Sequence, residues 1–306
     1  MQFKRFTRNN IIFNLMLVLL FATWASFLGG LRSDQLGLFA LYLGCFYATE
    51  KSRKFVLGFS IFIVFWIVYD SMRVLPNYEI STVHIREPYA LEKSLFGIQI
   101  NHSLLTPNEY FTNHTHRILD LLSGLFYINW MPVPLAFAVY LFIKDKYLFI
   151  KFSLVFLLTN LVGFAIYYIY PAAPPWYVNL YGFDLKIGGP GFTAGLGRFD
   201  ELVGIPVFAN IYNKNSNVLA AIPSLHAAYP VIVLYYGIRK RLGWINLFFA
   251  IFMIGIWFSA VYTGHHYIID IAVGVAVALI VIFTFERLSH VRMVNNWLIS
   301  FENQLT

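Results

Sequence analysis

Charged residues are scarce in this chain of 306 residues. Asp, Glu, Lys and Arg together make up 12% of it, whereas hydrophobic residues make up 59%. Soluble domains carry about 25% charged residues. The composition therefore excludes an ordinary soluble domain. Apolar runs long enough to cross a bilayer recur along the whole chain, which predicts an all-α, polytopic membrane protein.

Cysteine and metal-binding patterns are nearly absent as well. The single Cys45 lies in an apolar segment and allows no internal disulfide. The net charge of +7 includes no polybasic run of the kind that binds nucleic acid. Neither a His-Glu-x-x-His pattern nor a cysteine ligand set accompanies the histidines. We therefore expect no nucleic-acid partner, no bound metal and no cofactor.

Eight apolar segments are present, and we interpret all of them as transmembrane spans of one integral membrane domain over 1–306. The predicted spans are 11–30, 35–49, 55–72, 118–143, 148–170, 222–238, 243–262 and 266–286. The first follows a basic N-terminus but has no clear small-residue cleavage site, so we interpret it as a retained span rather than a signal peptide.

Basic residues cluster in every second connection between these spans. They are Lys4, Arg5, Arg8, Lys51, Arg53, Lys54, Lys144, Lys146, Arg239, Lys240, Arg241, Arg287 and Arg292. Positive charge in short loops marks the cytoplasmic face. Both termini are therefore predicted to be cytoplasmic, and the loops 73–117 and 171–216 to be non-cytoplasmic. Loops of that length in compact proteins are usually functional or disordered, and the aromatic residues of 168–183 favour order at the interface.

Titratable residues follow the seventh predicted span in the stretch "YTGHHYIID", residues 262–270. His266 and Asp270 are four residues apart, so on a helix they would share one face, whereas His265 would point about 100° away. A carboxylate beside an imidazole fixes its tautomer and strengthens it as a base or nucleophile. Taken alone, such a pair at the end of a span is more often an interfacial anchor than a catalyst.

A second stretch, "IPSLHAAYP" at 222–230, places His226 at a similar depth. Pro223 suits the first turn of a helix, and free amides at two neighbouring helix starts would favour an anion between them. Two histidines, an aspartate and an anion site are what phosphoryl transfer through a phosphohistidine requires. Zinc binding by His226, His265, His266 and Asp270 is a weaker alternative.

These residues resemble the phosphatidic acid phosphatase type 2 superfamily, whose motifs are Pro-Ser-x-His and Ser-Arg-x5-His-x3-Asp. Here the first motif is Pro223-Ser224-Leu225-His226. The second begins at Ser259-Ala260 and continues, with matching spacing, to His266 and Asp270. The resemblance implies a six-helix catalytic core, over about 55–286, in which His266 is the nucleophile, Asp270 its orienting partner and His226 the general acid. Ala260 replaces the motif arginine, and the superfamily's Lys-x6-Arg-Pro motif is absent.

Five further stretches point to a narrower branch. They are "YDSMRVLP" at 69–76, "REPYALEKSLFG" at 86–97, "YPAAPPWY" at 170–177, "IPSLHAAYP" at 222–230 and "GHHYIIDIAVG" at 264–274. They look like the inositol phosphorylceramide synthase family, which is related to the sphingomyelin synthases. The resemblance implies transfer of phosphoinositol from a glycerophospholipid to a ceramide hydroxyl, with release of diacylglycerol. A diester donor carries one negative charge and a monoester nearly two, so the loss of the motif arginine favours a transferase.

Substrate contacts are expected from Ser224, Ser259, Arg73, Tyr267 and Trp176. Arg73 sits at a span end beside Asp70; Arg86, Lys186 and Arg198 are further cations of the same loops, and a solvated role is more common for such charges. A lipid phosphate phosphatase of the same superfamily is the alternative enzyme, and a transporter or lipid-binding protein the alternative class.

The predicted partners are membrane lipids. The predicted active site is non-cytoplasmic: periplasmic in a bacterial inner membrane, which the compact chain favours, or Golgi-lumenal in a eukaryote.

Overall fold

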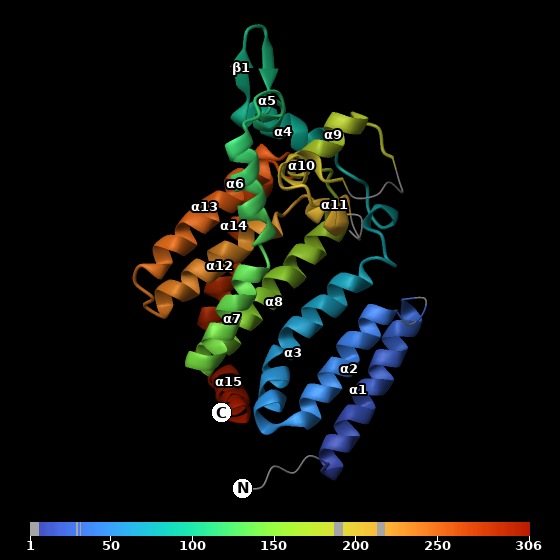
Figure 1. Ribbon diagram of the computed structural model, residues 1–306, viewed down its shortest axis with the longest axis vertical. Coiled ribbons are helices and arrows are strands. Elements are labelled where there is room, and N and C mark those ends of the chain that lie inside the picture. Colours follow the sequence, from blue (N-terminus) through green and yellow to red (C-terminus); the bar gives the residue numbers. More distant parts are fainter. Residues whose placement is uncertain (1–5, 29, 31, 187–191, 213–217) are drawn as a thin grey trace.

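The computed structural model describes residues 6–28, 30, 32–186, 192–212 and 218–306, and it is helical apart from one small hairpin (Figure 1). The helices of the bundle are α1 (Arg8–Phe27), α2 (Ser33–Ala48), α3 (Glu50–Ser71), α6 (Arg117–Ile128), α7 (Pro132–Lys144), α8 (Lys146–Ile169), α12 (Leu225–Arg239), α13 (Ile245–Tyr262), α14 (Ile268–Leu288) and α15 (Arg292–Leu305). The all-α prediction is confirmed.

Each predicted span coincides with a helix or a pair of helices. Among the described residues, α1, α3, α8, α13 and α14 are long and apolar enough to cross a membrane. The pair α6 and α7 forms a sixth such element if it is counted as one span. The helices α2 and α12 have 16 and 15 residues and are shorter than a full span. The protein is therefore a multi-pass membrane protein, and the count of eight spans stays a prediction.

The predicted span over 118–143 is formed by two helices rather than by one. α6 ends at Ile128, α7 begins at Pro132, and the two are bent by 41°. Pro132 has no N–H to donate, and its ring would clash with the carbonyl group four residues earlier, which kinks or breaks a helix. A proline is well suited to start the next helix instead. The break places Tyr127 and Trp130 beside the site described below.

The helix α12 is the centre of the bundle and packs against α7, α8, α13 and α14. Its first turn lies so close to α14 that a Cβ atom at Gly274 would come within 2.1 Å of the Ser224 carbonyl oxygen. Only glycine allows that approach. At the other end of the bundle, Lys151 of α8 and Glu286 of α14 form a buried ion pair of 2.6 Å, to which Tyr236 of α12 adds a hydrogen bond. A buried charge pair of this kind needs such partners.

The segments between the spans form a cap over one end of the bundle, at the top of Figure 1. The cap consists of η1 (Asn77–Glu79), α4 (Arg86–Phe96), β1 (Ile98–Ile100), β2 (Ser103–Leu105), α5 (Pro107–Asn113), α9 (Pro175–Tyr181), η2 (Ala194–Leu196), α10 (Gly197–Val203) and α11 (Val207–Tyr212). The strands β1 and β2 are antiparallel, with Ile98 opposite Leu105. The predicted order of both long loops is confirmed for their described parts; 187–191 and 213–216 lie outside the described residues.

Candidate active site

The stretch 262–270 is the connection between α13 and α14. α13 ends at Tyr262 and α14 begins at Ile268, so His265 and His266 do not lie on a helix. The prediction that His266 and Asp270 lie on one face of the same helix was therefore wrong, because only Asp270 belongs to α14. They still pair, with His266 Nδ1 at 3.3 Å from Asp270 Oδ2. The carboxylate reaches back over the helix start, where Oδ2 also accepts a hydrogen bond of 2.8 Å from the Tyr267 N–H.

Cap residues hold the backbone of this connection. The Gly195 N–H donates to the Thr263 carbonyl at 2.8 Å, and the Trp176 N–H donates to the Gly264 carbonyl at 3.0 Å. The Asn108 amide donates to the carbonyl of His266 at 2.9 Å. Gly264 itself has a φ of +75°, which a residue with a side chain rarely adopts. The positions of both histidines thus depend on contacts from three separate parts of the cap.

The first amides of α14 are already occupied by protein carboxylates. Glu92 of α4 accepts hydrogen bonds from the N–H groups of Ile268 and Ile269 at 3.0 and 3.2 Å. Burial raises the pKa of Glu92, against the effect of these two hydrogen bonds. Asp270 accepts from the Tyr267 amide and Glu92 from the next two. These are the amides that we expected to be available to an anion. The expectation of free amides at this helix start was therefore wrong, because the cap supplies their acceptor.

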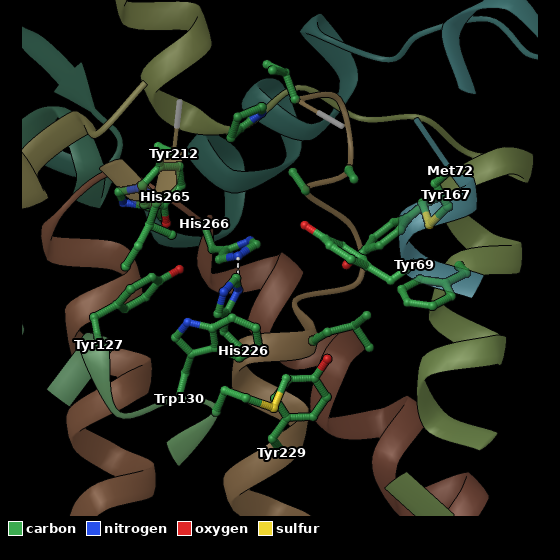
Figure 2. Close-up of a pocket in the computed structure, with 18 of the residues that line it drawn as sticks. Tyr69, Met72, Tyr127, Trp130, Tyr167, Tyr212, His226, Tyr229, His265 and His266 are labelled. Carbon is green, nitrogen blue, oxygen red and sulfur yellow. Dashed lines mark hydrogen bonds between the residues drawn. The ribbon is translucent and has the colours of Figure 1, made fainter. Parts of the chain in front are cut away.

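His226 meets His266 from the start of α12. Ser224 is the N-cap of this helix, so Pro223 precedes the helix rather than occupying its first turn, and that expectation was wrong as well. The Ser224 N–H donates to the Asp270 carbonyl at 2.9 Å, which links the starts of α12 and α14. Nδ1 of His226 lies 3.4 Å from Nε2 of His266. Figure 2 shows the two rings facing each other in the middle of the site.

The chain of contacts Asp270–His266–His226 has the geometry of an activated nucleophile. Asp270 faces Nδ1 of His266, so Nε2 is the nitrogen that faces outward. Burial lowers the pKa of His266 to about 4, so the ring is neutral near neutral pH and Nε2 keeps its lone pair. The His226 ring lies against Nε2 of His266, the nitrogen that is not paired with Asp270.

A cavity of about 390 Å³ opens in front of these two rings. Its walls come from α3, the break between α6 and α7, α8, the cap and the start of α12 (Figure 2). The residues that line it include Phe65, Trp66, Tyr69, Met72, Arg73, Tyr127, Phe164, Trp176, Tyr212, His226, His265 and His266. The predominance of aromatic and apolar side chains suits an amphipathic ligand that brings a small polar group to the histidines.

The predicted substrate-contact residues fall into two groups. Arg73 and Trp176 line the cavity, as expected. Ser224, Ser259 and Tyr267 are buried outside its lining. The Ser224 hydroxyl caps α12, and the Ser259 hydroxyl donates to the Gly255 carbonyl at 2.6 Å. These two serines shape the helix ends that carry the histidines, and their direct contact with a substrate stays a prediction.

The zinc alternative finds no support in the described part of the chain. No group of three or more His, Cys, Asp or Glu side chains in it is arranged to hold a metal ion. His265 was expected to point away from His266, yet it lines the same cavity. Its Nδ1 lies 3.0 Å from the Thr263 hydroxyl and not toward a point shared with His226 and His266.

Sequence reasoning missed the residues that support the histidines. Tyr127 stacks on His226 with ring centroids 5.0 Å apart, and Trp130 meets the same ring edge-on at 4.7 Å. Both belong to an aromatic-rich segment and look like ordinary lipid-facing residues in the sequence. The roles of Glu92 and Asn108 could not be read from the sequence either, although Glu92 lies in the stretch 86–97 that resembles the family. Each hydrogen-bonds to a backbone group more than 150 residues away.

Comparisons with known proteins agree with this geometry. A model of the PAP2 superfamily matches residues 89–284. The phosphoinositol dihydroceramide synthase of Bacteroides thetaiotaomicron is 48% identical over 84% of this chain and 85% of its own length. The chain belongs to the PAP2 superfamily and, within it, to the inositol phosphorylceramide synthase family.

Fungal relatives are more distant. The inositol phosphorylceramide synthase of Candida albicans is 27% identical over 83% of this chain, and the catalytic subunit of that synthase from Saccharomyces cerevisiae is 28% identical over 84%. The chain spans 52% and 63% of their lengths, respectively. No solved structure matches the chain.

Substitutions at the three central residues should separate their roles. His266→Ala removes the nucleophile and should abolish turnover and the acid-labile phosphoenzyme. Asp270→Asn should cost up to about 10⁴-fold in rate, by analogy with a triad aspartate. His226→Ala should cost about 10²- to 10⁴-fold, as loss of a general acid does. Rapid-quench capture of phosphohistidine measures the first step directly. A His266→Ala protein that still forms the phosphoenzyme would disprove the assignment of the nucleophile.

Proposed function

We propose that this protein transfers a phosphoinositol group from a glycerophospholipid to the hydroxyl of a ceramide-type lipid, through a phosphohistidine at His266 and without a metal ion. The observation that carries the proposal is the contact of His266 Nε2 with His226, with Asp270 behind the ring, at the end of a cavity lined by aromatic side chains. The names of the relatives, which are synthases acting on phosphoinositol and ceramide, support the choice of substrates.

The reaction has two half-reactions. In the first, Nε2 of His266 bonds to phosphorus while the bond from phosphorus to the diacylglycerol oxygen breaks. His226 gives that oxygen a proton, and Asp270 stabilises the positive charge on the substituted imidazole. In the second, the ceramide hydroxyl bonds to phosphorus, its proton returns to His226 and the bond from nitrogen to phosphorus breaks. The protein regains its starting state, and no third reactant is consumed.

The alternative is a phosphatase that passes the same phosphohistidine to water. Two features favour transfer to a lipid. Ala260 occupies the position of the superfamily's motif arginine and is fully buried, so one fixed positive charge is missing, which suits a diester better than a monoester. The side chains of Phe65, Trp66 and Phe164 line the cavity in the region of α3 and α8, where lipid chains can lie against them.

Arg73 is the cation best placed to replace the motif arginine. Of the four loop cations, Arg73 lines the cavity, whereas Arg86 lies over the Phe183 ring and Arg198 pairs with Asp120. Lys186 lies over the Tyr181 ring. The Arg73 Nε lies 3.2 Å from Asp70, a buried carboxylate that also accepts hydrogen bonds from Arg32 and Gln35. This arrangement fixes the guanidinium at the edge of the cavity.

Arg73→Gln should lower kcat/KM for the donor lipid by about 10- to 100-fold, the usual value of a hydrogen bond to a charged group. The reason is the loss of a fixed positive charge near the phosphodiester. Arg86→Gln is the matched control, since Arg86 is an exposed arginine of the same cap, and should change kcat/KM little. Equal effects of the two substitutions in a detergent-micelle transfer assay would remove Arg73 from the phosphate site.

The transfer itself is tested with purified protein, a phosphatidylinositol labelled in the head group and a ceramide, in a buffer that contains a chelator. The expected result is labelled phosphoinositol-ceramide, with none formed by the His266→Ala protein. A water-soluble labelled phosphate in its place would identify a phosphatase. Absence of both products would favour a lipid transporter, and activity that returns only with a divalent ion would contradict the metal-free mechanism.

We further propose that the active site lies on the non-cytoplasmic face. The basic connections expected on the cytoplasmic side and the cap that holds the histidines are at opposite ends of the bundle (Figure 1). Single cysteines at His102 in the hairpin and at Lys51 in the first turn of α3, on a Cys45→Ala background, report the orientation. An impermeant thiol reagent added to intact cells should label position 102 and not 51; the reverse pattern would place the site inside.

A further inference from the structure

The head group has to be bound through both half-reactions. Under the proposed function, on which this inference rests, diacylglycerol leaves first and the phosphoinositol group stays on His266 until the ceramide arrives. A binding site for the hydroxyl groups of that head group must therefore adjoin Nε2 of His266. It must also offer polar atoms that are not already used by the protein, because a buried hydroxyl needs hydrogen-bond partners.

One side of the cavity offers such atoms. The Nε2 atom of His265 and the hydroxyl of Tyr127 are both buried, and neither makes a hydrogen bond of ordinary geometry within the described residues. The Tyr127 hydroxyl still interacts with the side chain of Tyr212, so His265 Nε2 is the atom of this pair that is left without a donor. The two residues are 5% and 1% exposed, and both line the cavity. Buried polar atoms without a partner are rare in native structures and call for a ligand or an ordered water. His265 Nε2 is such an atom, and the Tyr127 hydroxyl belongs to the same side-chain cluster, since the rings of His265 and Tyr127 are 5.3 Å apart.

The tautomer of His265 follows from its neighbour. The Thr263 hydroxyl donates its single hydrogen to the Ser259 carbonyl at 2.7 Å, so toward His265 it can only accept. Nδ1 of His265, 3.0 Å away, therefore carries the hydrogen and donates it to Thr263. Burial lowers the pKa of His265 and keeps the ring neutral. Nε2 is then a hydrogen-bond acceptor that lines the cavity without a donor.

The cluster has a composition that suits adjacent hydroxyl groups. His265 supplies an acceptor, whereas Tyr127 supplies both a donor and an acceptor. Tyr212 lies against the His265 ring, with centroids 4.9 Å apart, and closes the outer side. Figure 2 shows His265, Tyr127 and Tyr212 on one side of the two catalytic rings, while Tyr69, Tyr167 and Met72 lie on the other side. Tyr127 also stacks on His226, which ties this cluster to the reacting groups.

We propose that His265 and Tyr127 form the subsite for the head group and bind hydroxyl groups of its polyhydroxylated ring. His265 Nε2 accepts a hydrogen bond from one hydroxyl, and the Tyr127 hydroxyl bonds to another. The first histidine of "GHHYIID" is thus a specificity residue, and the second is the nucleophile. The acyl chains of the donor lie toward the α3 side of the cavity, away from this subsite.

The test compares phosphatidylinositols with the same acyl chains, each lacking one ring hydroxyl. Wild-type protein should lose about 10- to 100-fold in kcat/KM with at least one of these analogues, because the partner atom is then left unpaired. His265→Leu should lower kcat/KM for the parent lipid by a similar factor and should no longer distinguish it from that analogue. His265→Gln, whose amide oxygen can reach the position of Nε2, should keep part of the discrimination.

A second variant separates binding from folding. Tyr127→Phe keeps the ring against His226 and removes a hydroxyl whose contact within the described residues is with Tyr212, so thermal stability in detergent should change little while discrimination against a deoxy analogue falls. Tyr236→Phe is the control, since its buried hydroxyl donates to Glu286 at 3.1 Å. It should lower stability and leave discrimination intact.

Three results would overturn or redirect the inference. If wild-type protein treats all deoxy analogues alike, no ring hydroxyl is bound by a hydrogen bond. If His265→Leu and Tyr127→Phe keep the full wild-type discrimination, the Nε2 atom of His265 and the Tyr127 hydroxyl hold water or serve only packing. Both results leave phosphoinositol transfer by the wild type intact. A wild type that transfers no phosphoinositol to ceramide would instead disprove the proposed function itself.

Discussion

The carboxylate and carbonyl of Asp270 hold the site together. The carboxylate binds the ring of His266 and the Tyr267 amide, and the carbonyl accepts from Ser224 at the start of α12. One residue therefore sets both the orientation of the His266 ring and the distance between the starts of α12 and α14, beside which the two histidines lie. The close approach allowed by Gly274 serves the same purpose, since a larger residue would separate α14 from Ser224. The order of a site formed at helix ends depends on how firmly those ends are held together.

The cap completes what the bundle cannot provide. The connection of His265 and His266 has no regular structure, so its carbonyl and amide groups need partners from elsewhere. Gly195, Trp176, Asn108 and Glu92 supply them from distant parts of the chain. As a result, the amides at the start of α14 are already paired with protein carboxylates. Arg73, with Asp70 behind it, is a cation that lines the cavity, whereas Ala260 at the position of the superfamily's motif arginine carries no charge.

The apolar and polar groups of the cavity lie on different parts of its wall. Aromatic and apolar side chains cover the walls from α3 and α8, and the polar atoms of His265 and Tyr127 lie near the catalytic histidines. Such a distribution lets a lipid keep its chains in an apolar environment while its phosphate reaches Nε2. The break at Pro132 contributes to this division, because it brings Tyr127 and Trp130 against His226 instead of leaving them on the face of a straight span.

The sequence alone determined the helical membrane architecture and the family. Its motifs also singled out His226, His266 and Asp270, which the structure brings together. Hydropathy reports bilayer crossing directly, and the spacing of His226, His266 and Asp270 is preserved in local motifs. The sequence could not predict the positions at the site of five residues, because each acts through a contact between segments far apart in the chain. They are His265, Tyr127, Glu92, Asn108 and Gly195. A helical period also gave the wrong geometry for 262–270, because residues 263–267 are a turn between two helices. Those features were decided by tertiary structure, where the packing of α12 against α14 and the cap fix which polar atoms are paired and which stay open to a ligand.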